Sequence, residues 1–242
     1  IEGYSEILSQ QFPHAWQAGP QTLLLRDQIT ALPDNGTVLI CPPADPYRCP
    51  PGPYERASLI AHWLKRHKPR AKILILDPKR SFSKQALFEQ AWRQHYAYGT
   101  EKALIEWHSL ADNPIQAIDP KSHTVITEFG DKFRGDVINL IPPQTAGQIA
   151  IDTGLTDQSG WCPINPFSSQ SLLVPGIHVI GDAGHYAPIP KSAFAANSEA
   201  KHCALSIRLM LQDQDPVDPV WFNTCYSAVT DDQAISVYHI SR

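Results

Sequence analysis

GTVLI, at residues 36–40, is a short apolar run rich in residues that favour β-strands. YERASLIAHWLKR, at residues 54–66, has the pattern of a helix, and AKILILD, at residues 71–77, has that of a second buried strand. Two strands joined by a helix form a βαβ unit, in which the strands are parallel and the crossover is right-handed. The sequence therefore predicts an α/β protein with a Rossmann-like sheet.

Elements on both sides of this unit continue the α/β pattern. The hydrophobic spacing predicts further helices over residues 22–32, 83–95, 145–151 and 192–211. It predicts further strands over residues 103–107, 124–128, 133–140 and 177–180. The strands at 124–128 and 133–140 should form a hairpin, because Phe129-Gly130-Asp131 provides a turn between them. Alternating apolar residues after Val217 predict the beginning of a small sheet.

The loop after the first strand, residues 41–53, reads CPPADPYRCPPGP. A dinucleotide site needs glycines here, so that backbone N–H groups can approach a pyrophosphate. Six prolines remove six N–H donors, and a single glycine remains. This unit is therefore not expected to bind NAD(P). Asp77 stands where a ribose-binding acid would stand, but without the glycines it is interpreted as a turn or helix-cap residue.

Composition limits the classes of function. The net charge of -4 gives no reason to expect a nucleic-acid partner. No run approaches the roughly 20 apolar residues that cross a bilayer, so no transmembrane segment is predicted. The five cysteines include no Cys-x-x-Cys pair and no Cys-x-x-Cys-His sequence, which leaves no zinc motif and no attachment site for a c-type haem. His62 and His67 do not share a helix face, so no metal site is predicted from them.

GIHVIGDA, at residues 176–183, resembles the second FAD motif of the pyridine-nucleotide-disulfide-reductase superfamily. In that motif the aspartate holds the ribityl chain, and the next helix points its N-terminus at the flavin. Further segments resemble the flavoprotein subunit of flavocytochrome c sulfide dehydrogenase and follow the order of that family. They are YRCPPGPYERA (47–57), VINLIPP (137–143), GWCP (160–163), PKS (190–192) and NTCYS (223–227).

The resemblance implies roles for particular residues. Cys49 and Cys225 correspond to a redox-active disulfide beside the flavin, and Glu55 to an acidic residue near it. Such a disulfide can accept sulfide by thiol–disulfide exchange. For Glu55 a structural role in the first turn of its helix remains equally open. The implied FAD contacts are Gly181, Asp182, Ala183, Pro190, Lys191 and Ser192, and the remaining cysteines, Cys41, Cys162 and Cys203, are interpreted as structural.

The same resemblance implies three parts of the chain. Residues 1–143 would form a degenerate NAD-like Rossmann domain, residues 144–215 the C-terminal half of an FAD-binding domain, and residues 216–242 a truncated interface segment. The glycine-rich N-terminal FAD-binding segment of the family has no counterpart here. The FAD site is therefore expected to be completed by a segment not present in this chain, which could be a separate polypeptide.

The implied function is oxidation of sulfide through the cysteine disulfide and FAD. Electrons would pass to a c-type cytochrome, so that the haem lies on a partner chain. A disulfide, together with the usual setting of the family, favours the periplasm. Two alternatives remain open: a flavoprotein resembling sulfide:quinone reductase, and a non-catalytic truncated remnant or binding module. A C-terminal membrane anchor would favour the first, and the absence of a bridge between Cys49 and Cys225 would favour the second.

Overall fold

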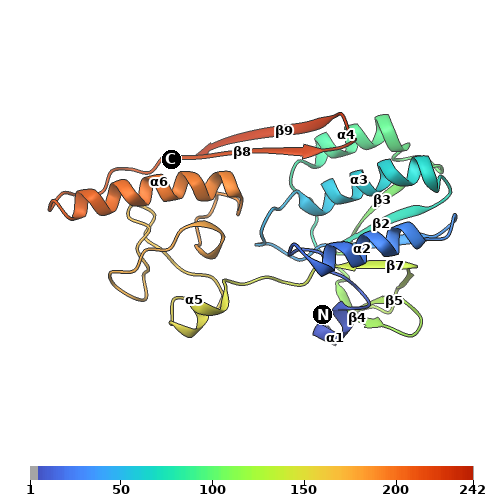
Figure 1. The fold of residues 1–242 in the computed structure, drawn as a ribbon, viewed down its shortest axis with the longest axis horizontal. Helices are drawn as coiled ribbons and strands as arrows, with labels where there is room; N and C mark the ends of the chain where they lie inside the picture. The colour runs from blue at the N-terminus through green and yellow to red at the C-terminus, as the bar shows by residue number, and fades with distance from the viewer. Residues whose placement is uncertain (1–4, 242) are drawn as a thin grey trace. The chain divides into compact units, whose positions relative to one another are not determined.

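The computed structural model describes residues 5–241, which form two compact units. The first unit contains the residues up to Asp45, Pro51–Pro143 and Ser227–Ile235. The second unit contains Pro46–Pro50, Gln144–Tyr226 and the residues from Ser236 onward. Figure 1 labels the helices and most of the strands of both units. Each unit is described by itself below.

A four-stranded parallel sheet forms the centre of the first unit. Its strands lie in the order β3-β2-β1-β7 and span Ile105–Ser109, Lys72–Asp77, Thr37–Cys41 and Val137–Leu140, respectively. Helix α3 (Gly52–His67) joins β1 to β2, so the predicted βαβ unit is confirmed. The strands are largely apolar because both faces of the sheet are covered. The expected α/β, Rossmann-like fold is therefore confirmed.

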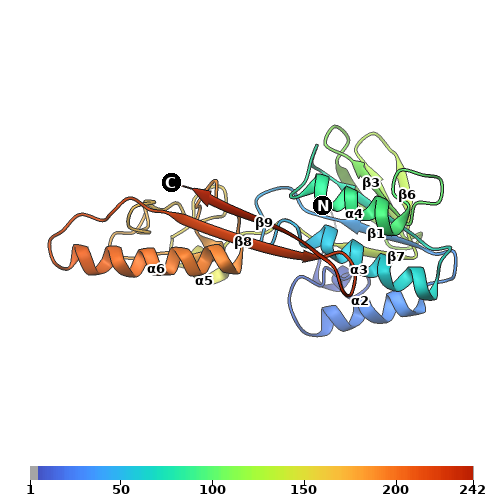
Figure 2. The same cartoon turned by 90° about the horizontal axis from the view of Figure 1, so that it is seen from above.

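Helices cover one face of this sheet. They are α2 (Pro20–Ala31), α3 and α4 (Gln85–Tyr96), and a short helix, α1 (Glu6–Ser9), precedes them. The buried residues of α3 recur at helical spacing, for example at Tyr54, Ala57 and Ala61, and pack with Val38 and Ile73 of the strands. Figure 2 shows α3 and α4 side by side, in agreement with the contacts between them.

A small antiparallel sheet covers the other face. Its strands lie in the order β4-β5-β6 and span Ile115–Asp119, Thr124–Thr127 and Lys132–Arg134. Val125 of β5 packs against Leu39 and Leu76 of the parallel sheet. The predicted hairpin is confirmed for β5 and β6. Strand β4 was not predicted. It has five residues, and the register of its pairing with β5 shifts between Ile115 and Ala117.

The prediction of a single strand over residues 133–140 is wrong. β6 ends and β7 begins within this range, and the two strands belong to different sheets. Gly135, between them, passes so close to the parallel sheet that an added Cβ would lie 2.6 Å from the side chain of Leu39. The N–H of Asp136 then donates to the carbonyl oxygen of Thr37 at 2.8 Å. A continuous run of strand-forming residues does not reveal such a change of sheet.

The second unit consists mostly of irregular segments beside a long helix, α6 (Ala193–Met210). It also contains α5 (Gln148–Asp152) and a 3₁₀ turn, η1 (Gly181–Ala183). The strand predicted over residues 177–180 is wrong. Within residues 5–241 this segment forms one isolated bridge, between Gln170 and His178, because its neighbour is itself irregular and no ladder can extend.

The C-terminal region forms a hairpin of β8 (Trp221–Ala228) and β9 (Ala234–Ser241). The small sheet predicted for the tail is therefore confirmed. We call Ser227–Ile235, which belongs to the first unit, the hairpin tip. No helix among residues 5–241 is long and apolar enough to cross a membrane.

Candidate functional site

The turn η1 of the second unit depends on two glycines. Gly181 has a φ of +74°, a conformation that side chains rarely adopt. At Gly184 an added Cβ would lie 2.5 Å from the ring of Tyr186. The turn also receives support from helix α6, because the N–H of Gly181 donates to Oε2 of Glu199 at 2.7 Å. The residues predicted from the FAD motif therefore form one tightly held turn.

Glu199 is a site residue that the sequence analysis missed. Its side chain is buried, with 3% exposed, and burial raises the pKa of its carboxyl group, as does the nearby carboxylate of Asp182. A signal for it was present in the sequence, since Glu199 lies four residues from both Ala195 and Cys203 on one face of the helix. These two neighbours are buried as well. A carboxylate on a stripe of small buried residues is expected to have a specific partner.

Lys191 is bound to the same turn. Its ammonium group donates to the carbonyl oxygens of Asp182 at 2.7 Å and of Gly184 at 2.8 Å. The same nitrogen lies 3.7 Å from the centroid of the Trp161 ring, a cation–π contact. Burial lowers the pKa of Lys191, and the neighbouring acids Asp182 and Glu199 oppose this shift. Two of the three ammonium donors are thus used to hold the turn, and the positive charge stays within it.

Asp182 carries a buried acceptor that the described protein atoms do not use. Its Oδ1 has no hydrogen-bond partner among residues 5–241. Burial raises the pKa of this carboxyl group, and the positive charges of Lys191 and Arg48 partly oppose the shift. A buried carboxylate oxygen without a donor is costly, so it is expected where a ligand hydroxyl completes the site. The resemblance assigns a sugar-chain hydroxyl of FAD to this position, and the orphaned oxygen fits such a group.

The segment before helix α6 is also shaped by local contacts. Ser192 is the N-cap residue of α6, and its hydroxyl oxygen accepts from the N–H of Ala195 at 3.1 Å. The same hydroxyl donates to Oδ1 of Asn223 at 2.5 Å. The side chain of Ser192 is therefore engaged within the protein, and Pro190 stands two residues before the cap. On the other side, the carbonyl oxygen of Ala183 accepts from the N–H of Cys162 at 2.9 Å.

Cys49 is tied to this site through its backbone. Its N–H donates to the carbonyl oxygen of Lys191 at 2.8 Å, and its φ is +58°. Cys225 lies in β8, is half-buried, and has its Sγ 3.8 Å from the carbonyl oxygen of Tyr226. Both cysteines belong to the second unit, together with the turn and Lys191. The disulfide between them stays a prediction.

Glu55 lies in the first unit, in the first turn of α3. Its Oε1 accepts from the backbone N–H of Ala228 in the hairpin tip at 2.7 Å. The negative charge is also favoured there by the N-terminal end of the helix. The catalytic role that the resemblance implies for Glu55 stays a prediction, but the carboxylate has a structural partner that the sequence did not reveal.

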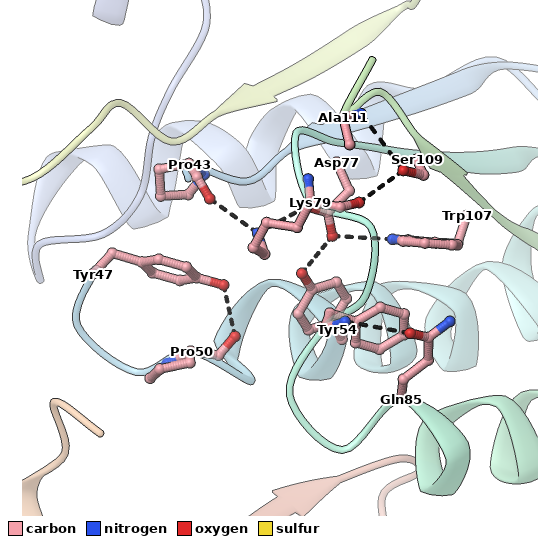
Figure 3. Close-up of polar contacts among 11 residues, drawn as sticks. Pro43, Tyr47, Pro50, Tyr54, Asp77, Lys79, Gln85, Trp107, Ser109 and Ala111 are labelled. Carbon is pink, nitrogen blue, oxygen red and sulfur yellow. Dashed lines mark hydrogen bonds and ion pairs between the residues drawn. The ribbon is translucent and has the colours of Figure 1, made fainter. Parts of the chain in front are cut away.

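Asp77 is much more than the turn or cap residue that the sequence suggested. The turn interpretation is correct in one respect, because Oδ1 accepts from the N–H of Lys79 at 3.1 Å. The side chain is, however, completely buried, and it also receives the hydroxyl of Tyr54, Nε1 of Trp107 at 3.0 Å and Nζ of Lys79 at 2.7 Å. Figure 3 shows these groups converging on the carboxylate. The position of a ribose-binding acid is thus filled by the protein's own side chains.

The loop of residues 41–53 is fastened to the same cluster. Nζ of Lys79 donates to the carbonyl oxygen of Pro43 at 2.9 Å. Tyr54, at the other end of the loop, stacks on Phe82 with ring centroids 3.8 Å apart. These contacts join the end of β1, the start of α3 and the end of β2 through protein groups. That this unit does not bind NAD(P) stays a prediction.

The remaining cysteines are buried thiols. Cys41, Cys162 and Cys203 all lie in the protein interior. Burial raises the pKa of the Cys41 thiol to about 12, and it also raises the pKa values of Cys162 and Cys203. A thiol with a raised pKa is a poor nucleophile at neutral pH. Their interpretation as structural residues agrees with this environment. In the described part of the chain, no group of His, Cys, Asp and Glu side chains could hold a metal ion.

A comparison of the sequence with family models identifies its relatives. Residues 22–142, half of the chain, match the model described as sulfide dehydrogenase (flavocytochrome c) flavoprotein chain, central. The chain belongs to this family. Cys49 and Glu55 of the flavocytochrome c sulfide dehydrogenase pattern lie within the matched region, whereas Cys225 and the turn at Gly181–Ala183 lie outside it.

Solved structures show the same fold at low sequence identity. A chain of the mitochondrial ATP synthase of Tetrahymena thermophila is 16% identical, with a TM-score of 0.67 over 94% of this chain and 55% of that one. The sulfide:quinone oxidoreductase of Aquifex aeolicus is 14% identical, with a TM-score of 0.62 over 90% and 57%. A ferredoxin reductase of Rhodopseudomonas palustris is 14% identical, with a TM-score of 0.56 over 93% and 54%. This chain thus spans little more than half the length of these proteins.

Proposed function

We propose that this chain is part of an FAD-dependent sulfide dehydrogenase that passes electrons to a c-type cytochrome. One observation carries the proposal: the backbone of Cys49 is bonded to Lys191, whose ammonium group is bonded to the turn Gly181–Ala183. A candidate redox cysteine and a candidate flavin-binding turn thereby belong to one connected group of residues. Membership of the family supports the same assignment.

Residues of the second unit would hold FAD. The orphaned Oδ1 of Asp182 would accept a hydrogen bond from a hydroxyl of the ribityl chain. The positive charge of Lys191, held in place by the turn, would favour negative charge on a bound cofactor. When bound, FAD supplies a two-electron acceptor to which the reduced cysteines return their electrons.

The cysteines would carry the first chemical step. Hydrosulfide attacks one sulfur of a Cys49–Cys225 disulfide, whose S–S bond breaks as a new S–S bond forms to the incoming sulfur. One cysteine then carries the substrate sulfur as a persulfide. The other leaves as a thiolate and holds the electron pair of the broken bond. The exchange is balanced, since sulfide sulfur is oxidised as the disulfide is reduced.

A segment outside this chain would complete the FAD site. Many apolar side chains of the second unit are exposed, among them Leu172, Phe194 and Leu211. Exposed apolar surface of this extent is typical of a surface that another polypeptide segment covers. The chain also spans little more than half of the length of structures with the same fold. We expect the covering segment to supply the glycine-rich part of the FAD site.

The electron acceptor would be a c-type cytochrome that carries its haem on a separate chain. The name of the matching family contains flavocytochrome c, and this chain has no haem attachment sequence. A redox disulfide is best maintained in an oxidising compartment, so we place the complex in the periplasm.

The test is the absorption spectrum of the natural flavoprotein during addition of sulfide. We expect the flavin band to bleach and to recover when oxidised cytochrome c is added. Cys49→Ser and Cys225→Ser should each slow bleaching by at least about a hundredfold, while Cys203→Ala, at a buried thiol, should not. Normal bleaching in both serine variants would refute the disulfide step. Recovery with a quinone but not with cytochrome c would refute the proposed acceptor, and a natural protein without flavin would refute the enzyme itself.

A further inference from the structure

The hairpin tip is fixed to helices α3 and α4 of the first unit. Val229 is buried in the core cluster of this unit, with its carbonyl oxygen accepting from the hydroxyl of Tyr96. Around it, Asp231 forms an ion pair with Arg66 at 3.0 Å, and Gln233 is bonded to His95 at 2.9 Å. The tip is therefore anchored by an apolar contact and by polar contacts on both helices.

Two further contacts act where β8 enters the tip. Nζ of Lys84 donates to Oγ of Ser227 at 2.9 Å, and Oε1 of Glu55 accepts from the N–H of Ala228 at 2.7 Å. The N–H of the next residue, Val229, points to the opposite strand, where it donates to the carbonyl oxygen of Gln233 at 2.9 Å. Because strand N–H groups alternate in direction, the N–H of Ala228 points away from β9. Glu55 satisfies this outward-pointing donor.

We propose that Glu55 is a positioning residue that holds the hairpin tip at Ala228 and does not act as an acid–base group. The contact requires one oxygen acceptor at the end of a side chain of this length, and it does not require an exchangeable proton. A glutamine places an amide oxygen at the same position, whereas an alanine leaves the N–H of Ala228 without its partner. The part of the proposal that concerns sulfide turnover rests on the proposed function.

The experiment compares Glu55→Gln with Glu55→Ala in the natural flavoprotein. Two quantities are measured: hydrogen exchange of the Ala228 amide and the pH profile of sulfide turnover. Glu89→Ala is the matched control, because this half-buried carboxylate of the same unit contacts Gln85 and Arg93 on its own helix. It should leave exchange at Ala228 unchanged.

We expect Glu55→Ala to accelerate exchange at Ala228 by about tenfold or more, since a hydrogen bond to a charged group is lost. Glu55→Gln should restore most of the protection of the Ala228 amide, and neither variant should remove a limb of the pH profile of sulfide turnover.

The opposite pattern would overturn the proposal. If Glu55→Gln loses as much turnover as Glu55→Ala and also loses one limb of the pH profile, while exchange at Ala228 stays unchanged, Glu55 is an acid–base residue. Unchanged exchange in Glu55→Ala alone also refutes the anchor. If the natural protein does not oxidise sulfide, the proposed function fails, but exchange at Ala228 still decides whether Glu55 anchors the hairpin tip.

Discussion

The two units differ in how they bury their apolar residues. In the first unit, both faces of a parallel sheet are covered, one by helices and the other by a small antiparallel sheet. In the second unit, two small clusters form the core, and apolar residues such as Leu172, Phe194 and Leu211 are exposed. The first unit therefore has a layered core on both faces of its sheet, although Ile7, Leu59 and Phe129 are exposed in it. The second unit holds well-defined polar contacts around much smaller apolar clusters.

The largest predicted effect is a difference in the free energy of unfolding when one phenylalanine is truncated in each unit. Phe88 is completely buried in the first unit, whereas Phe194 on α6 has 49% of its surface exposed. Phe88→Ala should lower the free energy of unfolding by about 3–5 kcal/mol, because it leaves a cavity. Phe194→Ala should change it by at most about 0.5 kcal/mol. Urea unfolding measures both, and equal losses would contradict the difference in packing.

The same two variants also test the proposed segment that covers the apolar surface of the second unit. Once the covering segment is bound, Phe194→Ala should weaken that association, while Phe88→Ala should affect it only through stability. The affinity of the segment for each variant, measured below the unfolding transition, distinguishes the two effects. An unchanged affinity for Phe194→Ala would remove this side chain from the proposed interface.

A smaller loss of stability is expected when the buried carboxylate of Asp77 in the first unit loses one hydrogen-bond donor. Tyr54→Phe removes the hydroxyl that donates to Asp77, and it should cost about 1–3 kcal/mol of stability because a buried charged acceptor loses a donor. Tyr238→Phe, at a side chain with 81% of its surface exposed, is the matched control and should be neutral. Thermal unfolding measured at one pH checks both variants. A neutral Tyr54→Phe would mean that the cluster around Asp77 contributes little to the first unit.

The smallest effect concerns pH, and it should have opposite signs in the two units. Burial raises the pKa of Glu199, so the folded second unit binds this proton more tightly than the unfolded chain and loses stability as pH rises above the ordinary value of 4.5. The hydrogen bond from Lys72 lowers the pKa of Glu106 in the first unit, so that contribution is present above 4.5 and is lost as pH falls.

Hydrogen exchange at η1 and at β3, measured from acidic to neutral pH, tests this difference. Glu199→Gln should flatten the pH dependence at η1, and Glu106→Gln should flatten it at β3. If stability measured by exchange changed with pH in the same direction in both units, groups other than Glu199 and Glu106 would dominate the pH dependence.

The sequence predicted those parts of the fold that depend on local pattern. The strands around Val38 and Ile73 and the helices beside them follow from hydrophobic spacing and were found as expected. The change of sheet at Gly135 was missed, because it depends on the close approach of Leu39, which lies nearly a hundred residues earlier in the chain. The segment at residues 177–180 has a strand sequence but pairs with an irregular neighbour.

The site was predicted as a set of residues rather than as a set of contacts. The family pattern named Asp182 and Lys191, but only the structure shows that Lys191 binds two carbonyl oxygens of the turn and that Asp182 retains an orphaned oxygen. Glu199 lies outside every motif, and its partner Gly181 is 18 residues away. The partner of Glu55 is 173 residues away. Helical spacing can mark Glu199 as a buried carboxylate, but no local pattern names the partner in either contact.

The buried carboxylate of Asp77 also limits what this unit could be engineered to bind. Glycines placed in the loop of residues 41–53 would supply backbone N–H donors. Tyr54, Trp107 and Lys79 would still occupy the oxygens of Asp77, and each of these donors would have to be removed before a ribose could take its place. Each removal alone would leave a buried carboxylate with fewer donors and would destabilise the domain. Nucleotide recognition in this unit is therefore opposed by the interior of the domain as well as by the loop.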